Sequence, residues 1–178
     1  MRSVHFYIAL TLFLLIFLIG WLRLSGRLVF IRNISDFLPR ASSYPSRDLS
    51  QITHLIIHHS ASENQDAYDY AQFHLAKGWP GIGYHFVIDP DGAVNQTNVL
   101  ESVSYHTQNF NTPSVGICLS GDLNQHRMTT AQRNSLIRLI RHLKRKLPNR
   151  LTITGHRDHK ATDCPGAFTD LPEIINRI

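Results

Sequence analysis

An uncharged stretch, residues 4–22, does most to limit how this chain can fold. As a helix, these nineteen residues would be about 28 Å long, close to the hydrocarbon thickness of a bilayer. Leu, Ile and Phe cover its whole circumference, so it lacks the polar face of a helix that packs on a water-exposed core. We therefore predict an N-terminal transmembrane helix. A cleaved signal peptide is the alternative, although Gly20, Trp21, Leu22 and Arg23 make a poor cleavage site.

The net charge of +5 is concentrated in the first part of the chain. Residues 1–50 carry +4, whereas residues 51–178 carry +1 and are close to neutral. Because the basic excess lies beside the hydrophobic stretch, we predict no nucleic-acid partner. Arg2 precedes that stretch, and three arginines between positions 23 and 32 follow it. The positive-inside tendency would then place the C-terminal domain on the cytoplasmic face.

The rest of the chain divides into a linker and one folded domain. Residues 24–50 mix Arg, Ser, Pro and scattered apolar residues without a sustained period, which indicates a linker. We predict strands at 54–59, 83–88, 93–97, 114–119 and 151–154, and helices at 66–77, 130–147 and 171–178. This alternation predicts an α/β fold in which helices flank a mixed central sheet. The predicted segments are a membrane anchor or signal segment at 1–23, a linker at 24–50 and the domain at 51–178.

Histidines are the first candidates for chemistry, because the chain has eleven of them and histidine is the commonest metal ligand. His58 and His59 end the first predicted strand. Side chains alternate along a strand, so the two rings face opposite sides of the sheet. Only one of them can join a given site.

A second group of candidate ligands follows the last predicted strand. His156 leaves that strand after a glycine, and Cys164 follows eight residues later. A loop of this length can fold back and bring both side chains to one ion. Two histidines and a cysteine suit zinc, and three protein ligands leave a fourth position for water, as in catalytic zinc sites.

Alternatives remain at several of these positions. His159 and Asp163 are competing donors in the same loop. Cys164 could form a disulfide with Cys118, although Cys118 lies in an apolar strand and is typical of a small buried hydrophobic residue. Tyr84 opens a strand after two glycines, which let its backbone approach a neighbour closely, and it could serve packing alone.

Five segments in a characteristic order resemble the type 2 N-acetylmuramoyl-L-alanine amidase family, which includes phage lysozyme-type amidases and peptidoglycan recognition proteins. They are LIIHHSAS, QFHLAKGW, GIGYHFVIDPDGAV, SYHTQNFNTPSVGICLSGDL and TGHRDHKATDCPG, within residues 52–174. The resemblance implies a zinc enzyme that hydrolyses the amide bond between N-acetylmuramic acid and L-alanine in peptidoglycan or muropeptides. A non-catalytic peptidoglycan-binding module is the alternative, although such members typically lack the cysteine ligand.

The resemblance also implies roles for individual residues. The family's zinc ligands match His58, His156 and Cys164. Tyr84 matches the catalytic tyrosine, which would donate a hydrogen bond to the oxyanion. Thr162 matches a position that holds lysine in some branches and threonine in others, and we expect it to orient water or substrate. His106 matches a region that lines the substrate groove. A purely structural zinc site would need a fourth ligand, such as His159.

The substrate suggests where the domain would work. Mature peptidoglycan lies outside the cytoplasmic membrane, so we expect a membrane-anchored protein with its domain on the periplasmic or extracytoplasmic side. The arginine distribution favours the alternative, the cytoplasmic face, where the enzyme would recycle muropeptides. We expect a monomer whose partners are the peptidoglycan or muropeptide substrate and, through the N-terminal helix, the membrane.

Overall fold

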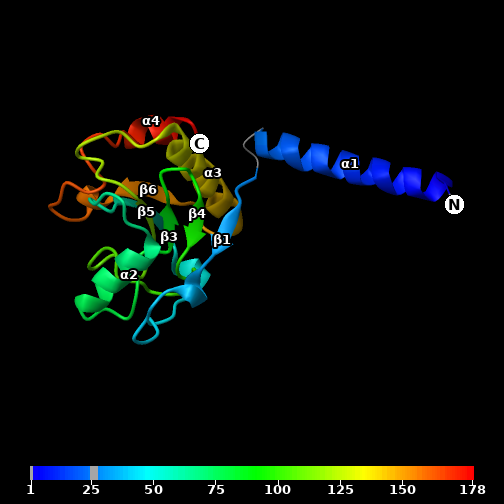
Figure 1. Ribbon diagram of the computed structural model, residues 1–178. Helices are drawn as coiled ribbons and strands as arrows, with labels where there is room; N and C mark the ends of the chain where they lie inside the picture. The colour runs from blue at the N-terminus through cyan, green and yellow to red at the C-terminus, as the bar shows by residue number, and fades with distance from the viewer. Residues whose placement is uncertain (1, 25–27) are drawn as a thin grey trace.

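The computed structural model describes residues 2–24 and 28–178 (Figure 1). The helices in these ranges are α1 (Arg2–Leu24), α2 (Ala67–Ala76), α3 (Thr130–Lys146) and α4 (Leu171–Asn176). The strands are β1 (Ile31–Asn33), β2 (His54–His59), β3 (Phe86–Ile88), β4 (Val94–Gln96), β5 (Ser114–Leu119) and β6 (Thr152–Gly155). Strands and helices are thus interspersed along the domain, as in the predicted α/β class, although β3, β4 and β5 follow one another directly.

The strands form one mixed sheet in the order β1-β4-β3-β5-β2-β6. The neighbours β3 and β4 are antiparallel, and the other neighbouring pairs are parallel. Every residue of β5 is buried, and so are the last five residues of β2. Such continuous burial is typical of parallel strands that are covered on both faces. The predicted mixed α/β sheet is confirmed.

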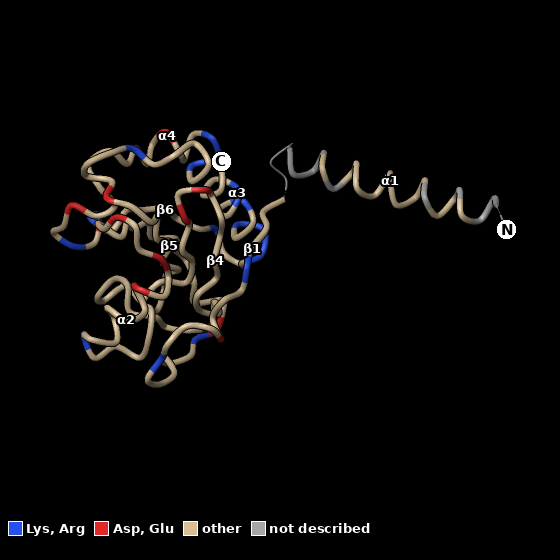
Figure 2. Tube along the Cα trace, in the orientation of Figure 1, with Lys and Arg blue, Asp and Glu red and all other residues tan. Residues whose placement is uncertain are grey.

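Helices cover both faces of this sheet (Figure 1). Leu136, Leu139, Ile140 and Leu143 of α3 lie in the main core with alternate residues of β2 and β5. On the other face, Ala67, Tyr70 and Ala71 of α2 pack with Val87 and Cys118. The Lys and Arg residues of α3, blue in Figure 2, are half-buried or exposed, so the outer side of this helix is the solvated basic face of an amphipathic helix.

Residues 28–50, which belong to the segment predicted as a linker, pack against the domain. Strand β1 pairs with β4 and completes one edge of the sheet. The Tyr44 hydroxyl donates to the carbonyl oxygen of Gly81 at 2.7 Å. The Arg47 guanidinium is buried and donates to the carbonyl oxygens of Asn111, Thr112 and Ser114. A strand of three residues with an arginine at its centre is too short to show an alternating pattern in the sequence.

The prediction of a transmembrane helix is wrong. Across residues 2–24 and 28–178, the structure contains no helix with the length and apolarity that crossing a bilayer requires. The uncharged stretch would span only about 28 Å as a helix, slightly less than a typical hydrocarbon core. Helix α1 itself begins at Arg2 and includes Arg23 in its last turn. The predictions that depended on this helix, namely a membrane anchor, a membrane partner and a location on either membrane face, are therefore not supported.

Two buried histidines predict that the domain loses stability in acid. Burial lowers the pKa of His74 to about 4 and that of His85 to about 3, with the charges of Lys77 and Arg47 as smaller causes. An unfolded histidine titrates near ~6.5, so below that pH the unfolded chain binds protons that the folded state does not. This part of the stability is complete above about pH 6.5 and is lost as the pH falls towards about 4.

We expect the free energy of unfolding of the zinc-free protein to be lower at about pH 5 than at about pH 7, by about 2 kcal/mol for each of these histidines. Urea titrations in the presence of a chelator measure this difference. The His74→Phe variant keeps the aromatic stacking on Trp79 and should lose about 2 kcal/mol less over the same interval. An identical pH dependence in this variant would contradict the assignment.

Candidate active site

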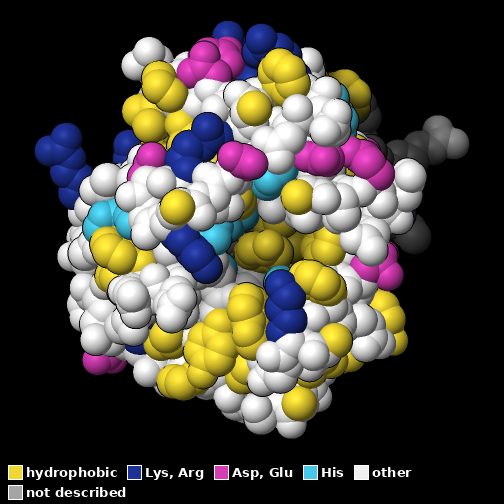
Figure 3. All heavy atoms as spheres, turned by 90° about the vertical axis from the view of Figure 1, so that its left-hand side faces the viewer, with side chains coloured by type: hydrophobic (Ala, Val, Ile, Leu, Met, Phe, Trp, Pro, Cys, Tyr) yellow, Lys and Arg dark blue, Asp and Glu magenta, His cyan; other side chains and the backbone are white. Residues whose placement is uncertain are grey.

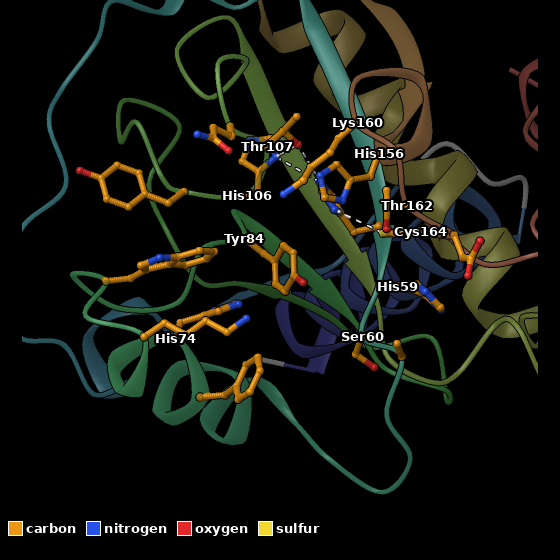
Figure 4. Close-up of a pocket in the computed structure, with 18 of the residues that line it drawn as sticks. His59, Ser60, His74, Tyr84, His106, Thr107, His156, Lys160, Thr162 and Cys164 are labelled. Carbon is orange, nitrogen blue, oxygen red and sulfur yellow. Dashed lines mark hydrogen bonds between the residues drawn. The ribbon is translucent and has the colours of Figure 1, made fainter.

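A cavity of about 840 Å³ lies at the carboxyl ends of β2 and β6. Its lining includes polar residues from the ends of these strands and aromatic residues from α2 and the loops that follow it. Figure 3 shows a hollow on this side of the molecule, with histidine and hydrophobic side chains around it and Lys or Arg side chains at its rim. Figure 4 shows residues that line the cavity.

Three predicted ligands meet at the base of this cavity. His58 lies near the end of β2, and His156 directly follows the parallel neighbour β6. Their ring centroids are 4.5 Å apart. Cys164 Sγ lies 3.6 Å from His58 Nδ1. One potential ligand atom from each of His58, His156 and Cys164 lies within 4.8 Å of the others.

The loop from His156 to Cys164 folds back as the spacing predicts. The Arg157 N–H donates to the carbonyl oxygen of Cys164 at 2.8 Å, which closes the loop. Gly166 then adopts a φ of 100°, and a Cβ at this position would lie 2.5 Å from the backbone of Leu123. Only glycine combines that φ with so close an approach, so it sets the path of the chain just after Cys164.

The neighbouring candidates have other partners. His59 points away from the three ligands, and its Nδ1 accepts a hydrogen bond from the backbone N–H of Leu123 at 3.0 Å. His159 Nε2 lies 2.8 Å from Thr154 Oγ1 and is outside the ligand group. Asp163 lines the cavity but is also outside that group. Cys118 is buried and free, so the alternative disulfide with Cys164 is absent.

The electrostatic environment suits a cation with soft and borderline ligands. Burial lowers the pKa of His58 and that of His156; the neighbouring histidines are the smaller cause for His58, and Lys160 is the next cause for His156. Burial raises the pKa of the Cys164 thiol to about 11. Neutral imidazoles offer free lone pairs, and a bound divalent cation would favour the thiolate. The donor set therefore fits zinc, which accepts histidine nitrogen and cysteine sulfur.

Tyr84 lies beside these ligands, just before β3. Its ring centroid is 5.4 Å from that of His58 and 5.3 Å from that of His74. A Cβ on Gly83 would lie 2.4 Å from the carbonyl oxygen of Tyr105, so a glycine is needed for this approach. Burial raises the pKa of Tyr84 well above its usual value, so the phenol keeps its proton and can donate a hydrogen bond.

The other two predicted residues differ in exposure. Thr162 is exposed at the edge of the cavity, where its Oγ1 accepts a hydrogen bond from the Cys164 N–H at 3.3 Å. His106 is only 6% exposed, although it contributes to the cavity lining. Its Nδ1 lies 3.1 Å from His58 Nε2, on the side of His58 opposite Cys164.

Sequence reasoning assigned no role to several further residues that line the cavity: Phe73, His74, Lys77, Trp79, Tyr105 and Lys160. His74 and Trp79 are stacked with centroids 4.6 Å apart, and the Lys77 ammonium lies 4.0 Å from the centre of the Phe73 ring. The segment QFHLAKGW contains four of them. Its helical period predicted α2, but not that its end would form a cavity wall.

Residues 48–167 match the family described as N-acetylmuramoyl-L-alanine amidase. The chain therefore belongs to this family, and the resemblance predicted from the five segments is confirmed. The solved structure of the N-acetylmuramoyl-L-alanine amidase LysC from Clostridium intestinale URNW is similar, with a TM-score of 0.76 and 27% identity. That match covers 84% of this chain and 97% of LysC.

The chain is similar in sequence to two kinds of protein, phage endolysins and peptidoglycan-recognition proteins. The chain is 33% identical to the endolysin of Enterobacteria phage K11 over 98 residues, which are 53% of this chain and 65% of the endolysin. It is 27% identical to peptidoglycan-recognition protein SC2 of Drosophila simulans over 154 residues, covering 78% of this chain and 81% of that protein. The match thus spans slightly less than two thirds of the length of the phage endolysin.

Proposed function

We propose that this protein is a zinc-dependent N-acetylmuramoyl-L-alanine amidase that hydrolyses the amide bond between N-acetylmuramic acid and L-alanine in peptidoglycan or muropeptides. The observation that carries this proposal is the meeting of His58, His156 and Cys164 beside Tyr84 at the base of one cavity. Membership of the amidase family supports it, and so does the likeness to an amidase and to a phage endolysin.

The proposed reaction is the attack of water on the muramoyl amide carbonyl. Zinc held by His58, His156 and Cys164 would supply Lewis acidity and lower the pKa of a bound water. Tyr84, protonated because of its burial, donates a hydrogen bond to the carbonyl oxygen as negative charge develops there. Thr162 is neutral, and its exposed position at the rim suits orienting the water or the substrate.

The cavity walls suit a substrate made of sugar and peptide. The rings of Trp79 and Tyr105 offer apolar faces on which a sugar ring can pack. Lys77 and Lys160 add positive charge to the same lining, which favours the carboxylates of a stem peptide. Similarity to peptidoglycan-recognition protein SC2 supports this substrate class.

Mass spectrometry of purified muropeptides tests the proposed activity. After incubation with the zinc-loaded protein, we expect free stem peptides that begin with L-alanine, together with glycan that has lost its peptides. Removal of zinc with a chelator should abolish the formation of both products. Zinc bound at about one ion per chain with muropeptide binding, but without these products, would instead identify a binding module.

A further inference from the structure

A line of hydrogen bonds leads from the base of the cavity into the protein interior. His58 Nε2 lies 3.1 Å from His106 Nδ1, and His106 Nε2 lies 3.2 Å from Ser114 Oγ. The Ser114 hydroxyl is hydrogen-bonded to the carbonyl oxygen of Phe110. The three side chains are 1%, 6% and 0% exposed, respectively. Each group in this line therefore depends on its protein neighbours for hydrogen bonds.

The donor and acceptor of each hydrogen bond can be assigned by starting from the Phe110 carbonyl at the inner end of the line. A carbonyl oxygen can only accept, so the Ser114 hydroxyl hydrogen points to Phe110. Ser114 Oγ then accepts from His106 Nε2, which must carry a hydrogen. A neutral imidazole has one ring hydrogen, so His106 Nδ1 accepts from His58 Nε2. This leaves the lone pair of His58 on Nδ1, the atom that faces Cys164 Sγ.

The Thr107 hydroxyl can also connect His58 to His106, and this connection gives the same position for the His58 hydrogen. Its Oγ1 lies 3.1 Å from His106 Nδ1 and 3.4 Å from His58 Nε2. If the Thr107 hydroxyl donates to His106, its oxygen is left to accept from His58. Both routes place the hydrogen of His58 on Nε2. A histidine binds zinc as the neutral imidazole, and this line of bonds accounts for one hydrogen on each ring.

The backbone beneath the His106 ring is shaped to hold it. Gly116 of β5 lies under the ring, and a Cβ at this position would be 2.6 Å from His106 Cγ. Even alanine would push the ring away from its present place. The side chain of Asn111 accepts from the backbone N–H groups of His106 and Thr107, at 3.0 Å and 2.7 Å. The ring is thus held from below and its backbone is held from the side.

We propose that His106 is a positioning residue that acts with Ser114 and the Phe110 carbonyl to keep His58 in the tautomer whose Nδ1 can bind zinc. This inference rests on the proposed zinc site. It differs from the expectation that His106 contacts substrate, because the hydrogen-bonding nitrogens of its ring are directed to His58 and Ser114. Groups that fix the tautomer of a metal-binding histidine typically contribute about 10-fold to 100-fold to metal affinity.

The tautomer can be measured directly in the zinc-free full-length protein. Long-range ¹⁵N–¹H correlation spectra of the histidine rings should show the hydrogen on Nε2 in both His58 and His106. A hydrogen on Nδ1 of His58 would overturn the proposal. The measurement needs no substrate, so it is decisive even if the protein proves to bind peptidoglycan without cutting it. It also needs no variant and so does not depend on whether a mutant folds.

Zinc affinity provides the second test. In His106→Phe, which keeps a ring but removes the acceptor, we expect zinc affinity to fall about 10-fold to 100-fold and His58 to populate both tautomers. His106→Gln, whose amide oxygen can still accept from His58, should recover most of the affinity. His54→Phe is the control, because His54 lies at the other end of β2 and its Nδ1 bonds Thr53. Unchanged zinc affinity in a folded His106→Phe would overturn the proposal and favour a substrate contact.

Discussion

Replacing Cys164 by serine should remove most of the bound zinc and lower amidase activity at least ~100-fold. Cysteine binds zinc as a thiolate, whereas a serine hydroxyl keeps its proton near neutral pH and is a much poorer ligand. Burial raises the pKa of Cys164 to about 11, so zinc binding must displace the thiol proton. Zinc affinity should therefore fall as the pH is lowered. Metal analysis and turnover, measured on the same samples of Cys164→Ser, test the first result.

His59→Ala is the matched control for this experiment. His59 is adjacent to the proposed ligand His58, but its ring faces the other way and accepts from Leu123. We expect the variant to retain its zinc, with a loss of stability from the unpaired Leu123 N–H. Full zinc occupancy in Cys164→Ser would contradict the ligand assignment, and loss of zinc in His59→Ala would show that the wrong histidine was assigned.

The sheet and helices that support the site could be predicted because their signals are local. The apolar runs of β2 and β5 are visible in short windows of sequence. A capping box, which is likewise a local signal, starts α3: Thr129 Oγ1 accepts from the Gln132 N–H, and the Gln132 side chain accepts from the Thr129 N–H. Alternation along β2 likewise predicted that His58 and His59 face opposite sides, as they do.

Other features depend on contacts between distant residues. Strand β1 pairs with β4, which follows it by some sixty residues, and the buried Arg47 is stabilised by carbonyl oxygens more than sixty residues away. The position of His106 behind His58 depends on the space above Gly116, which no pattern in the sequence reveals. The transmembrane prediction for α1 was wrong by a small margin, because the uncharged stretch is close to the length that a helix needs to span a bilayer.

Tyr84→Phe should lower turnover about 100-fold to 1000-fold while leaving zinc in place. The phenol is protonated and lies beside the proposed metal ligands, where it can donate to an oxyanion that exists only during the reaction. Its loss should therefore affect kcat much more than KM. The phenylalanine ring keeps the contacts with His58 and His74, so we expect thermal stability to change little.

The effect of Tyr84→Phe can be separated from a general loss of polarity in the cavity by comparison with Tyr105→Phe. Tyr105 also lines the cavity, but its ring packs on Trp79 and Tyr44. If only the hydroxyl beside the metal site stabilises the transition state, Tyr105→Phe should keep turnover within a few-fold of the wild-type value. Normal turnover in Tyr84→Phe would make Tyr84 a packing residue. Equal losses in both variants would assign the effect to the cavity as a whole, because both tyrosines line it, whereas Tyr84 packs beside His58 and Tyr105 packs beside Trp79 and Tyr44.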